Sequence, residues 1–147
     1  MSWRLLACVL AACGTDGPPT CAANTVQLDG TVGGTAVHQS GAPTSYAFNN
    51  AFGPTHGAVS IGFGDSGVVD LAWADLVADD HTTAANGSLL LSTSSPYCIK
   101  AATLTPKTDA EGGGVSFSLT TLTSGACPGT PIDGSVEGCA APGAAPN

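Results

Sequence analysis

The sequence predicts an all-β fold, a small antiparallel β-sandwich or barrel-like domain of about seven to nine strands that is cross-linked by disulfides. Its 147 residues suffice for one domain. With 20 glycines, 10 prolines and one methionine, the composition disfavours helices and favours strands and turns. Apolar residues alternate with polar ones in several short segments, as expected of strands buried on one face. Four cysteines follow residue 20, an even number that can form the disulfide cross-links.

The beginning of the chain has the features of an export signal. One positive charge, on Arg4, precedes an apolar run over residues 5–12. As a helix this run would cover about 12 Å, against about 30 Å of membrane hydrocarbon, so it is too short for a permanent membrane span. A charged start, a short apolar centre and small residues at the end are typical of a signal peptide.

The apolar run ends in Leu10-Ala11-Ala12-Cys13, which resembles the lipobox of bacterial lipoproteins. In that family the peptide before the cysteine is removed, the sulfur receives a diacylglyceryl group, and the new amino terminus is usually acylated. The resemblance implies that residues 1–12 are a lipoprotein signal peptide and that Cys13 is the lipidated residue. Cys8 closes a second match, but little apolar sequence precedes it. The alternatives are an ordinary signal peptide or a buried apolar strand.

A lipid on Cys13 would make the membrane a partner of this protein. Two or more acyl chains, at about 0.8 kcal/mol per buried methylene, give stable anchoring. Residues 13–20 would be the lipidated cysteine and a flexible tether, whose seven residues after Cys13 span about 15 Å as a coil. Gly14 follows the cysteine, and in the family's sorting rule this gives no signal for inner-membrane retention. The expected location is the cell envelope, with the outer membrane favoured over the inner.

The charge of the chain excludes two classes of partner. Three basic residues against eleven acidic ones give a net charge of −8. Once Arg4 is removed with the signal, Lys100 and Lys107 are the basic residues that remain. Nucleic acid and anionic lipid headgroups both require a basic patch. The protein is therefore not expected to bind nucleic acid, and its membrane attachment would depend on the covalent lipid.

Alternation places the strands along a domain that spans residues 21–139. The clearest segments cover residues 25–32, 59–63, 69–73, 89–91, 97–104 and 115–122. Residues 70–80 also fit a short helix, so a strand followed by a short helix or loop is expected there. Residues 140–147 contain no large apolar side chain to bury, and they are expected to form a disordered tail.

One short pattern occurs near both ends of this domain. Residues 29–34 read DGTVGG and residues 133–138 read DGSVEG. We expect the two segments to be neighbouring strands at the closure of the sheet, with glycine where their backbones come close. In a chain this rich in glycine, coincidence is the alternative.

The four remaining cysteines, Cys21, Cys98, Cys127 and Cys139, predict two disulfides. A hairpin folded about residue 110 brings Cys98 close to residue 122, within a few residues of Cys127, which favours the pair Cys98–Cys127. The pair Cys21–Cys139 would then join the two ends of the domain. Zinc is the weaker alternative, because the spacings contain no Cys-x₂₋₄-Cys motif.

Two segments are candidates for catalytic residues. Gly64-Asp65-Ser66-Gly67 resembles the tetrapeptide around the nucleophile of chymotrypsin-like proteases, and His38 lies in a segment distantly similar to the histidine segment of that family. The acid of the triad is missing, since Asp65 is the one acidic residue between His38 and Ser66. A hairpin turn is the better interpretation. Hydrolase elbows and phosphate loops are absent, and no catalytic residue or cofactor is assigned.

The densest polar cluster contains Asp75, Asp79, Asp80 and His81. Closely spaced carboxylates can bind Ca²⁺, but the EF-hand pattern is missing. We interpret the cluster as a surface loop and assign no metal ligand.

The preferred function is a lipid-anchored envelope lipoprotein that acts as a non-enzymatic binding or structural module for a protein or carbohydrate ligand. A small exported hydrolase with an unrecognised site is the alternative. Aromatic residues at strand positions could line a sugar-binding face, although such residues are more often core: Tyr46, Phe48, Phe52, Trp73 and Tyr97.

Overall fold

The computed structural model describes residues 20–52, 56–74, 81–92, 96–107 and 114–143. The described residues form strands and no helix, which confirms the all-β prediction. The described residues contain ten strands, slightly more than expected, because several short or weakly apolar segments also pair. In chain order they are β1 (Thr25–Val32), β2 (Thr35–Gly41), β3 (Ser45–Phe52), β4 (His56–Phe63), β5 (Gly67–Trp73), β6 (Thr83–Leu90), β7 (Tyr97–Lys107), β8 (Gly114–Ser124), β9 (Thr130–Ile132) and β10 (Gly134–Ala141).

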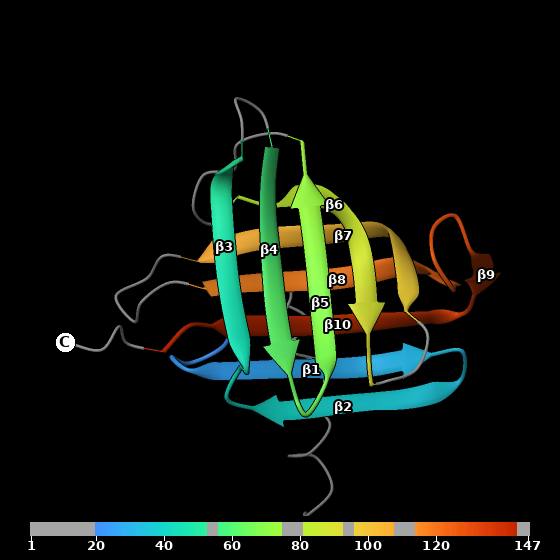
Figure 1. Cartoon of the computed structure of the whole chain (residues 1–147), viewed down its shortest axis with the longest axis horizontal. Coiled ribbons are helices and arrows are strands. Elements are labelled where there is room, and N and C mark those ends of the chain that lie inside the picture. Colours follow the sequence, from blue (N-terminus) through green and yellow to red (C-terminus); the bar gives the residue numbers. More distant parts are fainter. Residues whose placement is uncertain (1–19, 53–55, 75–80, 93–95, 108–113, 144–147) are drawn as a thin grey trace, which may run out of the picture.

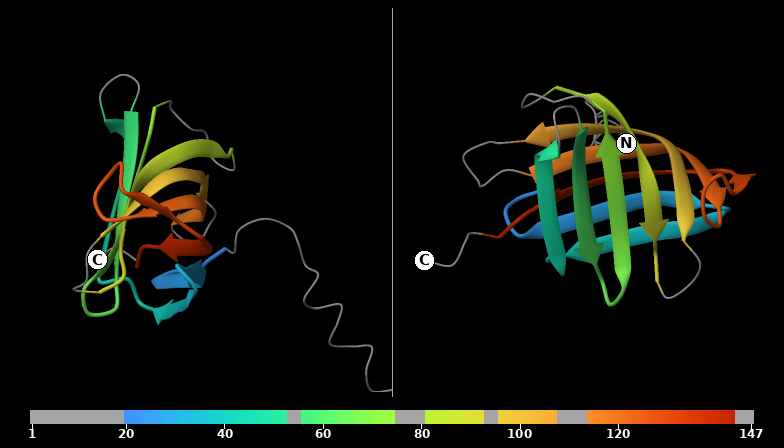
Figure 2. Two further views of the ribbon diagram at one scale, coloured as in Figure 1. Left: turned by 90° about the vertical axis from the view of Figure 1, so that its right-hand side faces the viewer. Right: turned by 45° about the horizontal axis from the view of Figure 1, so that its top comes forward.

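All strands belong to one antiparallel sheet that folds over on itself. The strand order is β2-β1-β10-β8-β7-β6-β5-β4-β3, and β9 adds to β8. We call β3, β4, β5 and β6 the front layer and β7, β8, β10, β1 and β2 the back layer; the strands of the two layers cross in Figure 1. Figure 2 shows the sheet curving from the front layer into the back layer. A register shift occurs in the β6–β7 pair, where the two layers meet, and others occur in the neighbouring β7–β8 pair.

A single hydrophobic core fills the space between the layers. On β5, Val69, Leu71 and Trp73 are buried, whereas Asp70 and Ala72 between them are exposed. This alternation confirms the period-two prediction for that segment. The largest fully buried side chains come from both layers and include Phe63, Ile61, Leu71 and Leu89 in the front layer and Phe117, Leu28, Leu104 and Leu119 in the back layer.

The two similar segments near the ends of the domain are neighbours, as predicted. In the β1–β10 pair, Gly30 lies opposite Val136 and Gly134 lies opposite Val32. A Cβ on either glycine would overlap the main chain of the opposite strand. Each glycine therefore lets the two backbones come close, although the pair lies inside the sheet and not at its closure.

The domain extends further toward the carboxyl end than the sequence predicted. Ala140 and Ala141 belong to β10, are buried, and lie opposite Val26 and Thr25 of β1. The assignment of residues 140 and 141 to a disordered tail was wrong, because small methyl groups in a paired strand can fill the core without a large side chain. Residues 144–147 lie outside the described part.

Other predictions fall on residues that are not described. The signal peptide, Cys13 and the tether up to residue 19 lie outside the described residues, and so do residues 75–80, where the possible helix was expected. Within the part of the chain that the structure describes, no helix has the length and apolar character needed to cross a membrane.

Candidate binding face

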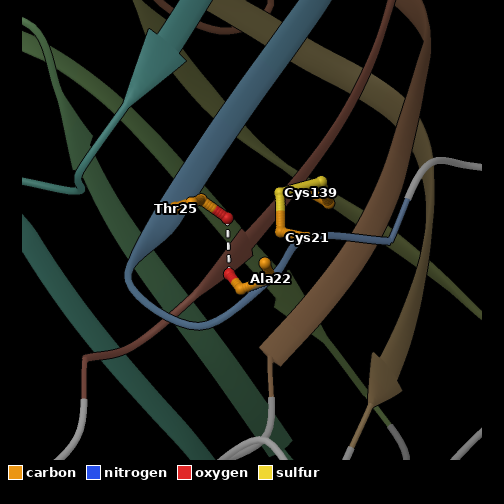
Figure 3. Close-up of a disulfide and its surroundings, with 4 residues drawn as sticks. All are labelled: Cys21, Ala22, Thr25 and Cys139. Carbon is orange, nitrogen blue, oxygen red and sulfur yellow. Dashed lines mark hydrogen bonds between the residues drawn. A yellow bond between two sulfur atoms is a disulfide. The ribbon is translucent and has the colours of Figure 1, made fainter.

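Both predicted disulfides are present and have the predicted pairing. Cys21 and Cys139 have Cα atoms 5.5 Å apart across a sequence separation of 118 residues. Cys98 and Cys127 have Cα atoms 5.1 Å apart across 29 residues. Figure 3 shows Cys21 beside β10, at the start of the turn that leads into β1.

The turn after Cys21 is closed by a side-chain hydrogen bond. The Thr25 hydroxyl donates to the carbonyl oxygen of Ala22, as Figure 3 shows. The amino end of the domain is thus held at β10 by a covalent bond and at β1 by a local turn.

The outward side of the front layer, here called the outer front face, carries small side chains. Strand register aligns them in rows across the sheet. One row is Asn49, Ala58, Ala72 and Asn86, and a second is Ala47, Ser60, Asp70 and Ser88. Because alanine and serine extend little above the main chain, the twisted sheet is left with a hollow of about 440 Å³ over these rows.

Two further hollows continue this one toward the back layer. One of about 470 Å³ lies over β5, β6 and the start of β7, where its lining includes Ala72, Ala84 and Lys100. Another of about 390 Å³ lies between Lys100 and the turn that contains Cys127 and Pro128. Asn86 lines all three hollows. Together they form a continuous shallow groove from β3 to the turn after β8.

The groove has a mostly apolar surface that carries a few polar side chains. Its lining includes one carboxylate, Asp70, and one ammonium group, Lys100, at separate positions along the groove. The amides of Asn49 and Asn86 and the hydroxyls of Ser60 and Ser88 complete the polar set, and alanine methyl groups form much of the floor. Such a surface suits an extended ligand with hydroxyl or amide groups and little net charge.

The aromatic residues do not form a sugar-binding platform on this face. Tyr46 and Phe48 lie opposite Ile61 and Val59, so they share the inward side of the front layer. Trp73 is buried and its ring lies 5.6 Å from that of Phe48. Burial raises the pKa of Tyr46 to about 12. Tyr97 is half-buried against the core, so the interpretation as core holds for Tyr46, Trp73 and Tyr97. Phe48 is exposed at the margin of the front layer, and the side chain of Phe52 is not described.

The catalytic candidates occupy ordinary structural positions. Asp65 and Ser66 form the tight turn between β4 and β5, as predicted, with Gly64 at a φ of +56°. His38 lies on β2 and contacts Asp29 of β1, with its Nδ1 2.5 Å from Oδ1 of the carboxylate. Both side chains are largely exposed.

No metal site is formed by the described residues. Among them, no group of three or more His, Cys, Asp and Glu side chains is arranged to hold a metal ion. His81 is exposed, and Asp75, Asp79 and Asp80 lie outside the described residues.

Sequence reasoning did not find the groove or its polar residues Asn86, Lys100 and Ser60. A signal was present, since the outward positions of residues 58–60, 70–74 and 84–88 are mainly Ala, Ser, Asn and Asp and lack long side chains. The alignment of those positions into a groove depends on strand register, which alternation alone does not give.

Comparison with known proteins identified no relative of this chain. No protein-family model, no curated protein and no solved structure matches the chain.

Proposed function

We propose that this chain is a lipid-anchored binding protein of the bacterial cell envelope, held to the membrane by a lipid on Cys13 and binding its ligand through the outer front face. Two features support the anchor. Leu10-Ala11-Ala12-Cys13 resembles a lipobox. The two disulfides of the domain are typical of proteins that fold in an oxidising compartment outside the cytoplasm.

The position of Cys21 is the observation that carries the proposal. Val136 and Ala140 on β10 point into the core, so Cys139 between them lies on the outward side of the back layer. Cys21 is bonded to it there. The seven residues between Cys13 and Cys21 reach at most about 25 Å when extended. The back layer would therefore be the side nearer the membrane, and the grooved front layer would point away from it.

The lining of the groove supports a ligand class. Neutral amides and hydroxyls over an alanine floor would bind an uncharged extended chain, such as a polysaccharide or an extended peptide segment. Among the described lining residues there are one carboxylate and one amine and no histidine, which supports binding rather than hydrolysis.

The anchor is tested by labelling with radioactive palmitate in a bacterial host. We expect the wild type to be labelled and to fractionate with membranes, whereas Cys13→Ser should lose the label and become soluble. Cys8→Ser is the matched control and should keep both properties. A labelled Cys13→Ser variant, or an unlabelled wild type that begins at Met1, would refute the anchor.

The binding face is tested by filling the groove. Against a panel of neutral oligosaccharides and extended peptides, Ala72→Trp should weaken binding of the best wild-type ligand at least about tenfold, because the indole would occupy the floor of two hollows. Thr31→Trp, on the outward side of the back layer, should bind like the wild type. Equal binding by both variants would exclude this face, and turnover of a bound ligand would favour the exported hydrolase.

A further inference from the structure

The Cys98–Cys127 disulfide lies at the end of the groove and differs from the other disulfide in its surroundings. We infer that Cys127 is a modification site, at which a small thiol that carries carboxylates forms a mixed disulfide and releases Cys98. The Cys21–Cys139 bond stays closed under the same conditions. This inference does not depend on the lipid anchor or on the ligand proposed above.

Access to the sulfur atoms differs between the two bonds. Cys127 is exposed in the turn between β8 and β9, and its partner Cys98 is buried on β7. Both residues line the 390 Å³ hollow, which is large enough for the end of a small thiol. In the other bond, Cys139 is fully buried on β10 between β1 and β8, and Cys21 is partly buried and so less exposed than Cys127. Since exchange requires a thiolate to reach a disulfide sulfur, the Cys98–Cys127 bond is the better substrate.

The positive charge of Lys100 favours thiols that carry carboxylates. Lys100 lines the same hollow as Cys98 and Cys127, and its side chain is exposed. Its ammonium group attracts a carboxylate on the incoming thiol, in a protein whose net charge of −8 otherwise repels anions. The same ammonium stabilises the thiolate that leaves during exchange.

The step is an ordinary thiol–disulfide exchange. The thiolate of the small thiol attacks Sγ of Cys127, the Cys98–Cys127 bond breaks, and its electron pair leaves on Sγ of Cys98. Cys98 then takes a proton from water and becomes a free thiol. A second molecule of the small thiol can cleave the mixed disulfide, which leaves two protein thiols and one small-molecule disulfide. Electrons balance without a further oxidant or reductant.

Modification would alter the end of the binding groove. The turn after β8 covers the buried hydroxyl of Thr123, and a Cβ on Gly129 would overlap that hydroxyl. Once the disulfide opens, β9 is attached to the sheet through three pairs of residues with β8. A group attached to Cys127 would also lie beside Asn86, which lines all three hollows.

The test compares the two disulfides within one protein. The purified exported chain is exposed to glutathione for increasing times and quenched with acid, and free thiols are then alkylated and mapped by mass spectrometry. We expect Cys98 to become alkylated and Cys127 to carry the glutathione mass, at a rate at least about tenfold above any opening of Cys21–Cys139. Equal opening rates, or the adduct on Cys98 instead of Cys127, would overturn the inference.

Variants at Lys100 distinguish the effect of its charge on the exchange rate from the effect of the exposure of the disulfide. Lys100→Gln should slow the reaction with glutathione about two- to fivefold, the effect of one exposed charge. Its reaction with the neutral thiol 2-mercaptoethanol should be unchanged, and Lys100→Arg should restore the glutathione rate. If Lys100→Gln slows both thiols equally, the selection of anionic thiols is refuted.

Discussion

The two layers of this sheet bury similar inward faces but present different outward faces. Across the back layer, one outward row places His38, Asp29, Glu137, Ser118 and Thr103 side by side. Across the front layer, the corresponding rows contain alanine, serine and asparagine with one aspartate. The back layer therefore has a charged, solvated surface, whereas the front layer has a groove.

This difference shows which part of a strand sequence carries information about function. The inward residues of both layers obey the same requirement, which is to fill one core, and they say little about what the protein binds. The outward residues have no packing requirement, so long polar side chains are the ordinary choice there. Small side chains in aligned outward rows are the exception, and in this protein they mark the candidate site.

The largest effect should come from removing the disulfide that holds the amino end to the back layer. Replacing Cys21 and Cys139 together by Ser should lower the free energy of unfolding by about 4–5 kcal/mol, because the bond closes a loop of 118 residues. The same change at Cys98 and Cys127, which close a loop of 29 residues, should cost about 3–4 kcal/mol. Urea unfolding of both double variants measures the difference. A larger loss for the shorter loop would contradict the chain-entropy explanation.

Two phenylalanines allow the stability contributed by the core of the back layer to be compared with that contributed by the margin of the front layer. Phe117 on β8 is fully buried against Gly138, whereas Phe48 on β3 is 37 % exposed. Phe117→Ala should cost about 3–5 kcal/mol through lost burial and the cavity left behind. Phe48→Ala should cost about 1 kcal/mol, since much of its ring is already in water. Equal losses in thermal or urea unfolding would show that Phe48 is as important to the core as Phe117.

Alternation predicted the strands whose inward side chains are large, such as Val69 and Leu71 on β5. It missed β2 because Val37 is the one buried apolar side chain in that strand. The last residues of β10 were missed for a related reason, since alanine carries almost no hydrophobic signal. The disulfide pairing was predictable because one hairpin limits what Cys98 can reach. The groove was not, because it depends on the register between neighbouring strands, which alternation alone does not give.

Tyr46 gives the front layer a specific response to alkaline pH. Burial raises its pKa to about 12, so the folded state retains a proton that the unfolded chain releases near its ordinary pKa of about 10. This contribution to stability is fully present below pH 10 and is lost as the pH rises toward 12. Because the side chain is only partly buried, we expect a loss of about 1 kcal/mol. Tyr46→Phe should lack this part of the alkaline decrease in urea-unfolding stability, and an unchanged decrease would contradict it.

The smallest effect should come from the charged surface of the back layer. His38 contacts Asp29, and the next residue in the row across β1 and β10 is Glu137, so two carboxylates lie on adjacent strands. His38→Ala removes the ring Nδ1–H that donates a hydrogen bond to the Asp29 carboxylate, but both side chains are largely in water. We expect stability to change by less than about 0.5 kcal/mol, and any loss to shrink in high salt. A loss above about 1 kcal/mol that persists in high salt would mean that the charged residues of the back layer stabilise the fold. The outward faces of the two layers would then differ in their contribution to stability as well as in their exposure to water.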